Sequence, residues 1–107
     1  MNERRYVVLH HTGWGEDHYD LLLEVSPDGP LESWRLSEWP PTERTLIGIN
    51  APHRRLYLDY EGEVSHGRGH VSRAASGTYT ELRENQNRLL VCAPSRLRIL
   101  LPDSSQS

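Results

Sequence analysis

Short apolar runs bounded by glycine, proline, asparagine or aspartate recur along almost the whole chain. Apolar and polar residues tend to alternate within these runs, as they do in strands that bury one face, and a new run begins about every 8 to 14 residues. The predicted strands cover residues 6–10, 19–25, 31–36, 44–49, 56–60, 69–73, 77–82, 88–92 and 97–101. This spacing predicts an all-β fold, a small closed or nearly closed β-barrel of roughly six to nine short strands.

The length of the chain and its turn signals limit the organisation further. The 107 residues suffice for one hydrophobic core and not for two, so residues 1–101 are expected to form a single domain. The clearest turn spans Ser26 to Pro30 and should join two antiparallel strands, because Pro27 presets one dihedral angle and Gly29 permits a positive φ. Residues 79–86 are a weak candidate for a helix, and residues 102–107 are expected to be a disordered tail.

The charge of the chain and its single cysteine exclude several classes of protein. With a formal net charge of −3, no overall positive field attracts the protein to nucleic acid, so any phosphate contact must be local. Cys92 stands alone, which excludes an internal disulfide framework. Because the sequence lacks both the apolar core of a signal peptide and the roughly 18 apolar residues of a membrane span, we expect a cytoplasmic protein without a membrane partner.

Two histidines and an aspartate near the N-terminus predict a metal site. His18 and Asp20 alternate along a predicted strand, so their side chains should share a face, and the loop after His11 can fold that histidine over them. Two imidazoles and one carboxylate leave coordination positions open, as in catalytic metal sites. A histidine taken singly is nevertheless more often a surface or core residue than a ligand. The sequence has six of them: His10, His11, His18, His53, His66 and His70.

A second group of polar residues follows the fourth predicted strand. His53 and Tyr57 can both donate to an anionic oxygen, and the guanidinium groups of Arg54 and Arg55 suit a phosphate. These residues predict an oxyanion pocket, but they equally fit a solvated loop followed by a strand whose tyrosine packs by its ring. Arg68 lies between two glycines, in a turn that can approach a phosphate.

Several of these motifs follow one another in a characteristic order. They are Tyr6-Val7-Val8, His11, His18-Tyr19-Asp20 with Leu23-Glu24, Leu31-Glu32-Ser33-Trp34, His53 with Tyr57, Glu61-Gly62, and the stretch from Gly69 to Gly77-Thr78-Tyr79. In this order and spacing, over roughly residues 4–82, the chain resembles the 3′-phosphoesterase domain of bacterial DNA ligase D. Such domains occur fused to a ligase and as free-standing small proteins, and this chain looks like the free-standing kind. The family fold is a compact β-barrel.

The resemblance implies a manganese-dependent enzyme that removes a 3′-terminal ribonucleoside or a 3′-phosphate from nucleic acid and leaves a 3′-hydroxyl. His11, His18 and Asp20 fall on the family's metal ligands, and His53 and Tyr57 fall on its phosphate-contacting pair. The substrates would be DNA or RNA 3′ ends, and ligase or polymerase repair proteins would act in trans as partners. The chemistry would be metal-assisted phosphoryl transfer, in which His53 stabilises the transition state or protonates the leaving oxygen.

The chain departs from the family at basic positions that matter for catalysis. Leu22 stands where the family has a phosphate-holding arginine, Glu38 replaces a lysine, and Ala51 replaces an acidic residue. We therefore expect weak activity, which an arginine at position 22 should raise. The arginines that could take over the phosphate are Arg54, Arg55, Arg68 and Arg73.

Three alternatives stay open at this point. The spacing from His11 to His18 is one residue longer than in the family, so His10 competes with His11 as a ligand. A non-catalytic module that binds nucleic-acid ends or phosphate would keep the metal and lose turnover. A small cupin-like iron oxygenase would pair His18 and Asp20 with a distant histidine such as His70, but it leaves the motifs around His53 unexplained.

Overall fold

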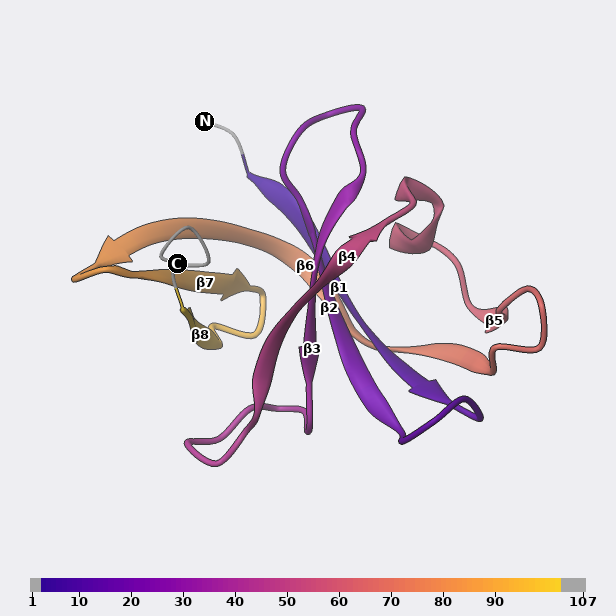
Figure 1. Cartoon of the computed structure of the whole chain (residues 1–107). Helices are drawn as coiled ribbons and strands as arrows, with labels where there is room; N and C mark the ends of the chain where they lie inside the picture. Colours follow the sequence, from indigo (N-terminus) through magenta and orange to yellow (C-terminus); the bar gives the residue numbers. More distant parts are fainter. Residues whose placement is uncertain (1–2, 103–107) are drawn as a thin grey trace.

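Figure 1 shows the computed structural model of the chain, which describes residues 3–102. The all-β prediction is confirmed: strands make up 57% of the chain and helical turns 4%, and an antiparallel sheet of eight strands curls through 218° into a half-barrel. Of the predicted tail, residues 103–107 lie outside the described range. The elements are β1 Arg4–Thr12, β2 His18–Glu24, β3 Leu31–Leu36, β4 Ile47–His53, the 3-10 helix η1 Arg55–Leu58, β5 Gly62–Glu63, β6 His70–Glu84, β7 Asn87–Ala93 and β8 Arg98–Leu101.

The sheet is a meander with one long strand that serves two neighbours. Its order is β4-β3-β2-β1-β6-β7-β8, and β5 pairs with the beginning of β6. The first part of β6 pairs with β1 and its last part with β7, which joins the two predicted strands at 69–73 and 77–82 into one strand of 15 residues. Figure 1 shows β6 passing from the side of β5 to the side of β7 and β8. At the change of neighbour lies Gly77, where a Cβ atom would come within 1.9 Å of the Ala93 carbonyl oxygen.

Two further predictions of secondary structure were wrong. The segment predicted as a strand at 56–60 begins with η1, whose turns are closed by bonds from the Tyr57 amide to the Arg54 carbonyl and from the Asp59 amide to the Leu56 carbonyl, both 3.1 Å. The short helix forms because it covers apolar residues of the sheet with Leu58, which is 3% exposed. The weak helical period at 79–86 belongs instead to the hairpin of β6 and β7, because pairing with β7 satisfies its backbone.

Apolar residues pack on both faces of the sheet. The larger cluster fills the inside of the curled sheet and contains Tyr6, Val8, Leu21, Leu23, Trp34, Leu36, Tyr79, Leu90, Cys92, Ile99 and Leu101. The smaller cluster lies on the other face, beneath η1, and contains Val7, Leu9, Leu22, Leu31, Leu58 and Val71. The continuous run from Leu21 to Leu23 follows from this arrangement, since successive residues of β2 point to opposite faces and both faces are covered.

A partly buried ion-pair network links β3 to β6 and β7. Arg88 of β7 donates from Nη2 to Glu32 Oε1 of β3 at 3.1 Å and from Nε to Glu81 Oε2 of β6 at 2.8 Å. Trp34 Nε1 donates to Glu32 Oε2 at 2.7 Å. Strands far apart in the sheet order are thereby joined, which stabilises the curl. Among the described residues, no helix is long and apolar enough to cross a membrane.

Candidate metal centre and adjoining cavity

The pairing of β1 with β2 brings the three predicted metal ligands together. In this antiparallel ladder His11 lies opposite His18, and Leu9 lies opposite Asp20, so all three polar side chains stand on the face of the smaller apolar cluster. Their candidate ligand atoms lie within 4.8 Å of one another. His11 Nδ1 is 3.6 Å from Asp20 Oδ2, and His18 Nε2 is 3.1 Å from Asp20 Oδ1. The sequence prediction of one clustered His-His-Asp group is confirmed.

Hydrogen bonds to backbone carbonyls fix which ring nitrogens carry protons. His11 Nε2 lies 2.7 Å from the Arg68 carbonyl oxygen, and His18 Nδ1 lies 3.0 Å from the Glu16 carbonyl oxygen. A carbonyl oxygen only accepts, so each of these nitrogens donates, and the neutral ring keeps its lone pair on the other nitrogen. In both rings that other nitrogen faces Asp20. Support of this kind is what orients histidines that bind metals in proteins.

Asp20 itself lacks a hydrogen-bond donor among the described residues. Its side chain is 3% exposed, and its Oδ1 atom has no hydrogen-bond partner, because the nearby His18 nitrogen does not approach it in hydrogen-bond geometry. Burial of a carboxylate without a partner is costly unless a cation compensates it. Two imidazole lone pairs and a carboxylate facing the same space therefore fit a divalent cation that accepts nitrogen and oxygen ligands.

Glycines in two loops let the backbone carbonyl of Arg68 reach His11. Gly69 has φ +89, and a Cβ atom there would come within 2.2 Å of the Thr12 carbonyl oxygen. Gly13, with φ +80, would place a Cβ atom 3.4 Å from the Gly69 Cα atom. The loop after β1 and the loop before β6 thus pack backbone against backbone, which only glycine permits at this distance.

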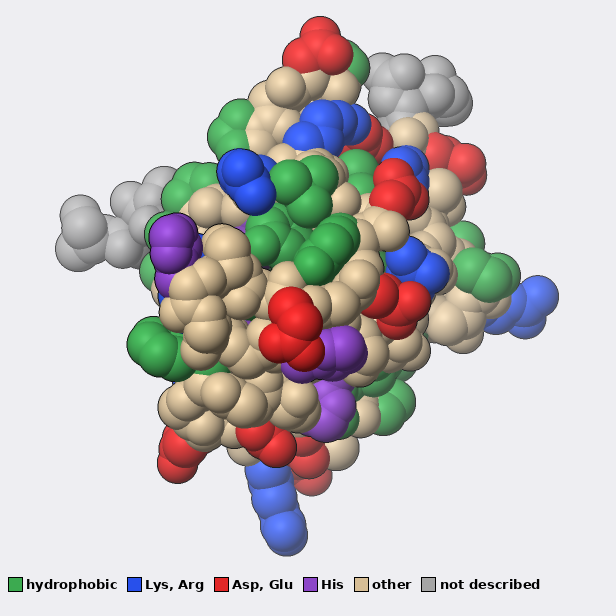
Figure 2. All heavy atoms as spheres, turned by 90° about the vertical axis from the view of Figure 1, so that its right-hand side faces the viewer, with side chains coloured by type: hydrophobic (Ala, Val, Ile, Leu, Met, Phe, Trp, Pro, Cys, Tyr) green, Lys and Arg blue, Asp and Glu red, His purple; other side chains and the backbone are tan. Residues whose placement is uncertain are grey.

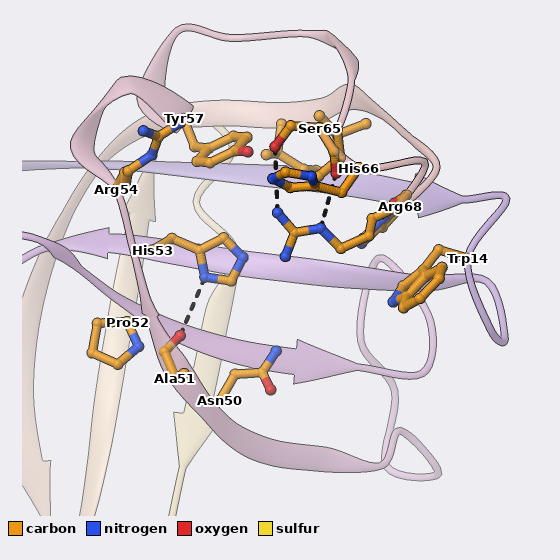
Figure 3. A pocket seen from close by; sticks show the side chains of 14 residues that line it. Trp14, Asn50, Ala51, Pro52, His53, Arg54, Tyr57, Ser65, His66 and Arg68 are labelled. Atoms are coloured by element: carbon orange, nitrogen blue, oxygen red, sulfur yellow. Dashed lines mark hydrogen bonds between the residues drawn. The ribbon is translucent and has the colours of Figure 1, made fainter.

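A cavity of about 530 Å³ opens beside the His11 ring. Figure 3 shows side chains from β4, η1 and the loop before β6 pointing into it. The polar residues that line it are His11, Asn50, His53, Arg54, Tyr57, Ser65, His66 and Arg68, and Trp14 closes one side. His53, Tyr57, Arg54 and Arg68, predicted to contact phosphate, therefore share one cavity with a member of the metal group.

His53 is held so that one ring nitrogen stays available to a ligand. Its Nδ1 atom lies 3.2 Å from the Ala51 carbonyl oxygen and donates to it, which leaves Nε2 without a protein partner among residues 3–102. The Tyr57 ring packs edge-on against His53 at a centroid distance of 5.7 Å and against Tyr60 at 5.6 Å. The tyrosine thus packs by its ring, as one sequence interpretation held, and also lines the cavity, as the other held.

The predicted phosphate-binding arginines separate into two groups. Arg68 donates from Nε to the Ser65 carbonyl at 2.9 Å, and Figure 3 shows its guanidinium group facing His53 across the cavity. Arg54 also lines the cavity. Arg55 points elsewhere: it pairs with Glu24 and donates to the carbonyls of Ser26 at 3.0 Å and Gly29 at 3.2 Å, where it fastens η1 to the turn after β2.

The positions that differ from the resembled family lie in distinct surroundings. Leu22 is 0% exposed and belongs to the smaller apolar cluster, so this position does not reach the cavity. This burial argues against the expectation that an arginine at position 22 would raise activity. Glu38 accepts hydrogen bonds from Thr42 and Thr45, which lower the pKa of its carboxyl group. Ala51 lines the cavity and supplies the carbonyl that orients His53.

The two competing histidines do not join the metal group. The His10 ring stacks on Tyr19 with a centroid distance of 4.4 Å, which places it on the opposite face of the sheet from His11. His70 pairs with Glu63 at 3.3 Å on the exposed edge formed by β5 and β6. His11 is therefore the histidine that stands with His18 and Asp20, and within residues 3–102 the triad with His70 does not form.

Sequence reasoning missed two residues that border the metal group. Arg35 lies directly opposite Asp20 in the ladder of β2 and β3, and Asn50 lies opposite Ser33 in the ladder of β3 and β4. His18, Arg35 and Asn50 line a second cavity of about 750 Å³. Only the strand register could have revealed these positions, because no motif in the sequence links residue 35 to residue 20.

The face that carries β5 and the turn between β1 and β2 has a mixed charge. Figure 2 shows histidine, arginine and acidic side chains interspersed there with apolar groups, and no continuous basic surface covers it. Contacts with a nucleic-acid backbone on this face would therefore be few and local, in keeping with the net charge of −3. Away from this face, burial raises the pKa of the Cys92 thiol to about 11, so this cysteine stays protonated and is no candidate nucleophile.

Two comparisons with known proteins identify no relative of this chain. No protein-family model matches the chain, and a search of curated proteins finds no significant match. What the chain does must therefore be inferred from its own side chains.

Proposed function

We propose that this protein is a metal-dependent phosphoesterase that acts on the 3′ ends of DNA or RNA and removes a 3′-phosphate or a 3′-terminal ribonucleoside. The observation that carries the proposal is the shared cavity, which joins His11 of the metal group to His53, Tyr57 and two arginines. A His-His-Asp group beside several donors to an anionic oxygen suits the binding of a phosphate at a metal.

His11, His18 and Asp20 would hold the metal, and the family resemblance implies that this metal is Mn²⁺. A bound divalent cation would polarise a phosphate oxygen and offset the negative charge of the transition state. Arg68 and Arg54 would bind the remaining phosphate oxygens, and the Tyr57 hydroxyl would donate to one of them. In hydrolysis of a 3′-phosphate, water would add to phosphorus and release a proton to solvent, and the bond from phosphorus to O3′ would break. His53, entering the step as an imidazolium whose Nδ1 donates to the Ala51 carbonyl, would deliver its Nε2 proton to O3′ and leave the step as a neutral ring.

Product sizing on labelled oligonucleotides tests this proposal. Wild-type protein, supplied with Mn²⁺ and a primer–template that ends in a 3′-phosphate or a 3′-ribonucleotide, should yield a shortened or dephosphorylated 3′-hydroxyl product. Chelation of the metal should stop the reaction, and His53→Ala should lower the rate by roughly 10²- to 10³-fold, as loss of one transition-state donor does. His70→Ala is the matched control, because that histidine is exposed and stands outside the cavity.

A non-catalytic role is the second candidate, because the buried Leu22 supplies no basic group beside the metal. That role becomes the better explanation if wild-type protein binds a 3′-phosphorylated oligonucleotide in a manganese-dependent way but releases no product. Activity that is unchanged in both His53→Ala and Asp20→Asn would exclude the proposed site altogether.

A further inference from the structure

A second cavity adjoins the metal group on the side of β3 and β4. Arg35, His18 and Asn50 line it, and Asn50 also lines the first cavity, so the two cavities meet at this residue. Figure 3 shows the Asn50 side chain at the margin of the first cavity, beneath His53. The metal group contributes one histidine to each cavity, His11 to the first and His18 to the second.

Arg35 is the cationic group of this second cavity. It stands opposite Asp20 in an antiparallel ladder, and directly opposed residues share a face with Cβ atoms about 5 Å apart. Three arginines elsewhere in the sheet and in η1, Arg5, Arg55 and Arg88, form ion pairs with carboxylates. Within the described part of the chain, by contrast, no hydrogen bond or ion pair engages the exposed guanidinium group of Arg35.

The floor next to Arg35 is open. Gly48 lies opposite Arg35 in the ladder of β3 and β4, on the same face, and a Cβ atom built there would meet nothing within 4 Å. A glycine at this position leaves room for a group of the ligand between the arginine and the edge of the sheet.

Two acidic residues limit where an anion can bind in this cavity. Glu16 and Asp17 also line it, and they belong to the turn that precedes His18. The ladder places Asn50 opposite Ser33, two pairs beyond Arg35 in the direction away from that turn. An anion is therefore favoured between Arg35 and Asn50, and it is disfavoured next to the turn.

We propose that this second cavity is a subsite for the phosphodiester next to the terminal one, bound by Arg35 and Asn50. The inference rests on the proposed function and deepens it, because it names the residues that bind the strand next to its terminal phosphate. Arg35 acts here as a residue that binds and positions the strand, and it supplies on β3 the basic contact that the buried Leu22 of β2 cannot supply.

Binding of two analogues that cannot be hydrolysed tests the subsite. Both end in a 3′-phosphonate, in which carbon replaces the bridging oxygen; the mononucleoside lacks the neighbouring phosphodiester, and the dinucleotide has it. Calorimetry with Mn²⁺ should show that wild-type protein binds the dinucleotide roughly ten-fold more tightly, the effect of one charge-assisted hydrogen bond. Arg35→Gln should remove this preference and leave the affinity for the mononucleoside and for Mn²⁺ unchanged.

Further variants separate the subsite from general effects. Gly48→Leu should fill the open floor and weaken only dinucleotide binding, whereas Glu16→Gln combined with Asp17→Asn should strengthen it. Arg98→Gln, at an exposed strand arginine that lines neither cavity, should change neither affinity.

Each remaining outcome decides against one of the two proposals. Equal affinity of wild-type protein for the two analogues overturns the subsite and leaves the proposed function standing. Equal weakening of both analogues in Arg35→Gln also overturns it, because Arg35 would then contact the terminal phosphate. If wild-type protein binds neither analogue in the presence of Mn²⁺, the proposed function itself fails.

Discussion

The proton positions on two histidines decide what the cluster between β1 and β2 can bind. The backbone carbonyls of Arg68 and Glu16 accept hydrogen bonds from His11 Nε2 and His18 Nδ1. The other ring nitrogen of each histidine, with its lone pair, therefore faces the carboxylate of Asp20. With both rings neutral, three electron-pair donors share one buried space, and a metal ion bound among them would compensate the charge of the carboxylate. The arrangement therefore makes opposite predictions for the stability of the metal-free protein and for its affinity for metal.

Replacement of Asp20 by asparagine separates these two effects. Asp20→Asn removes the anionic ligand, and Mn²⁺ affinity should fall by more than the roughly 10- to 100-fold that loss of a supporting hydrogen-bond partner costs. Stability without metal should stay equal or rise, because the amide is uncharged and can donate to an imidazole lone pair. Calorimetric titration with Mn²⁺ and urea denaturation measure the two quantities, with Asp28→Asn in the exposed turn after β2 as the control. A large loss of metal-free stability would show that Asp20 is a structural residue.

A glycine pair tests the backbone support of His11. In Gly69→Ala the new methyl group meets the Thr12 carbonyl at a φ of +89, so the variant should lose about 1–3 kcal/mol of stability and also bind Mn²⁺ more weakly. Gly67→Ala has a similar φ of +68 but meets nothing within 4 Å, so only the smaller backbone cost is expected. Thermal unfolding with and without Mn²⁺ compares the two variants. Identical metal affinity in both would mean that the Arg68 carbonyl does not orient His11.

At the scale of elements, β2 shows both what could be predicted from sequence and what could not. Alternation placed His18 and Asp20 on one face, and the structure confirms that placement. Leu22 lies on the same face, which suggested that an arginine there would reach a phosphate. Whether a residue on this face is exposed to solvent or buried depends, however, on what packs over it. η1 covers this part with Leu58, and η1 itself was predicted as a strand, because four residues of helical turn leave too short a signal.

Burial of position 22 makes a prediction opposite to the one drawn from the family resemblance. Leu22→Arg should destabilise the protein by about 4 kcal/mol or more, because the guanidinium group would enter an apolar cluster without a partner. Leu22→Met keeps volume and should cost less than about 1.5 kcal/mol. Urea denaturation compares the two variants. A Leu22→Arg protein that is as stable as wild type and more active would restore the interpretation of this position as a phosphate contact.

The register between strands carries the rest of the site and could not be deduced from one sequence. Arg35 borders Asp20 only because β3 pairs with β2 at that position, and Asn50 reaches both cavities only because β4 follows in the same ladder. Conversely, Arg55 has the residue type expected of a phosphate contact, yet it forms an ion pair with Glu24, which lies 31 positions earlier in the sequence. Long-range pairing of this kind leaves no local pattern.

At the scale of the whole molecule, the curl of the sheet depends on charge as well as on apolar packing. Burial raises the pKa of Glu32, but hydrogen bonds from Arg88 and Trp34 outweigh it and hold this pKa below its ordinary value. A carboxyl group with a lowered folded-state pKa stabilises the protein above its unfolded-state pKa, and this contribution is lost as the pH falls through the folded-state value.

The stability of the protein should therefore fall on acidification below about pH 4, near the ordinary pKa of glutamate. Glu32→Gln should flatten this fall, because the titrating group is gone. Arg88→Gln should be the more harmful change at neutral pH, by about 1–3 kcal/mol, since the half-buried Glu32 and the exposed Glu81 lose their common partner. Urea midpoints measured from pH 3 to pH 7 test this, with Glu84→Gln as an exposed control. If stability falls below about pH 4 in Glu32→Gln as steeply as in wild type, other carboxyl groups cause the fall.

The metal centre is the central claim, and anomalous scattering from crystals grown with Mn²⁺ tests it most directly. The account predicts one strong anomalous peak within bonding distance of His11 Nδ1, His18 Nε2 and an oxygen of Asp20. It also predicts that this peak disappears in Asp20→Asn while the hydrogen bonds of both histidines to their backbone carbonyls remain. A crystal saturated with Mn²⁺ that shows no peak between these three side chains, or shows it at other residues, would contradict the account.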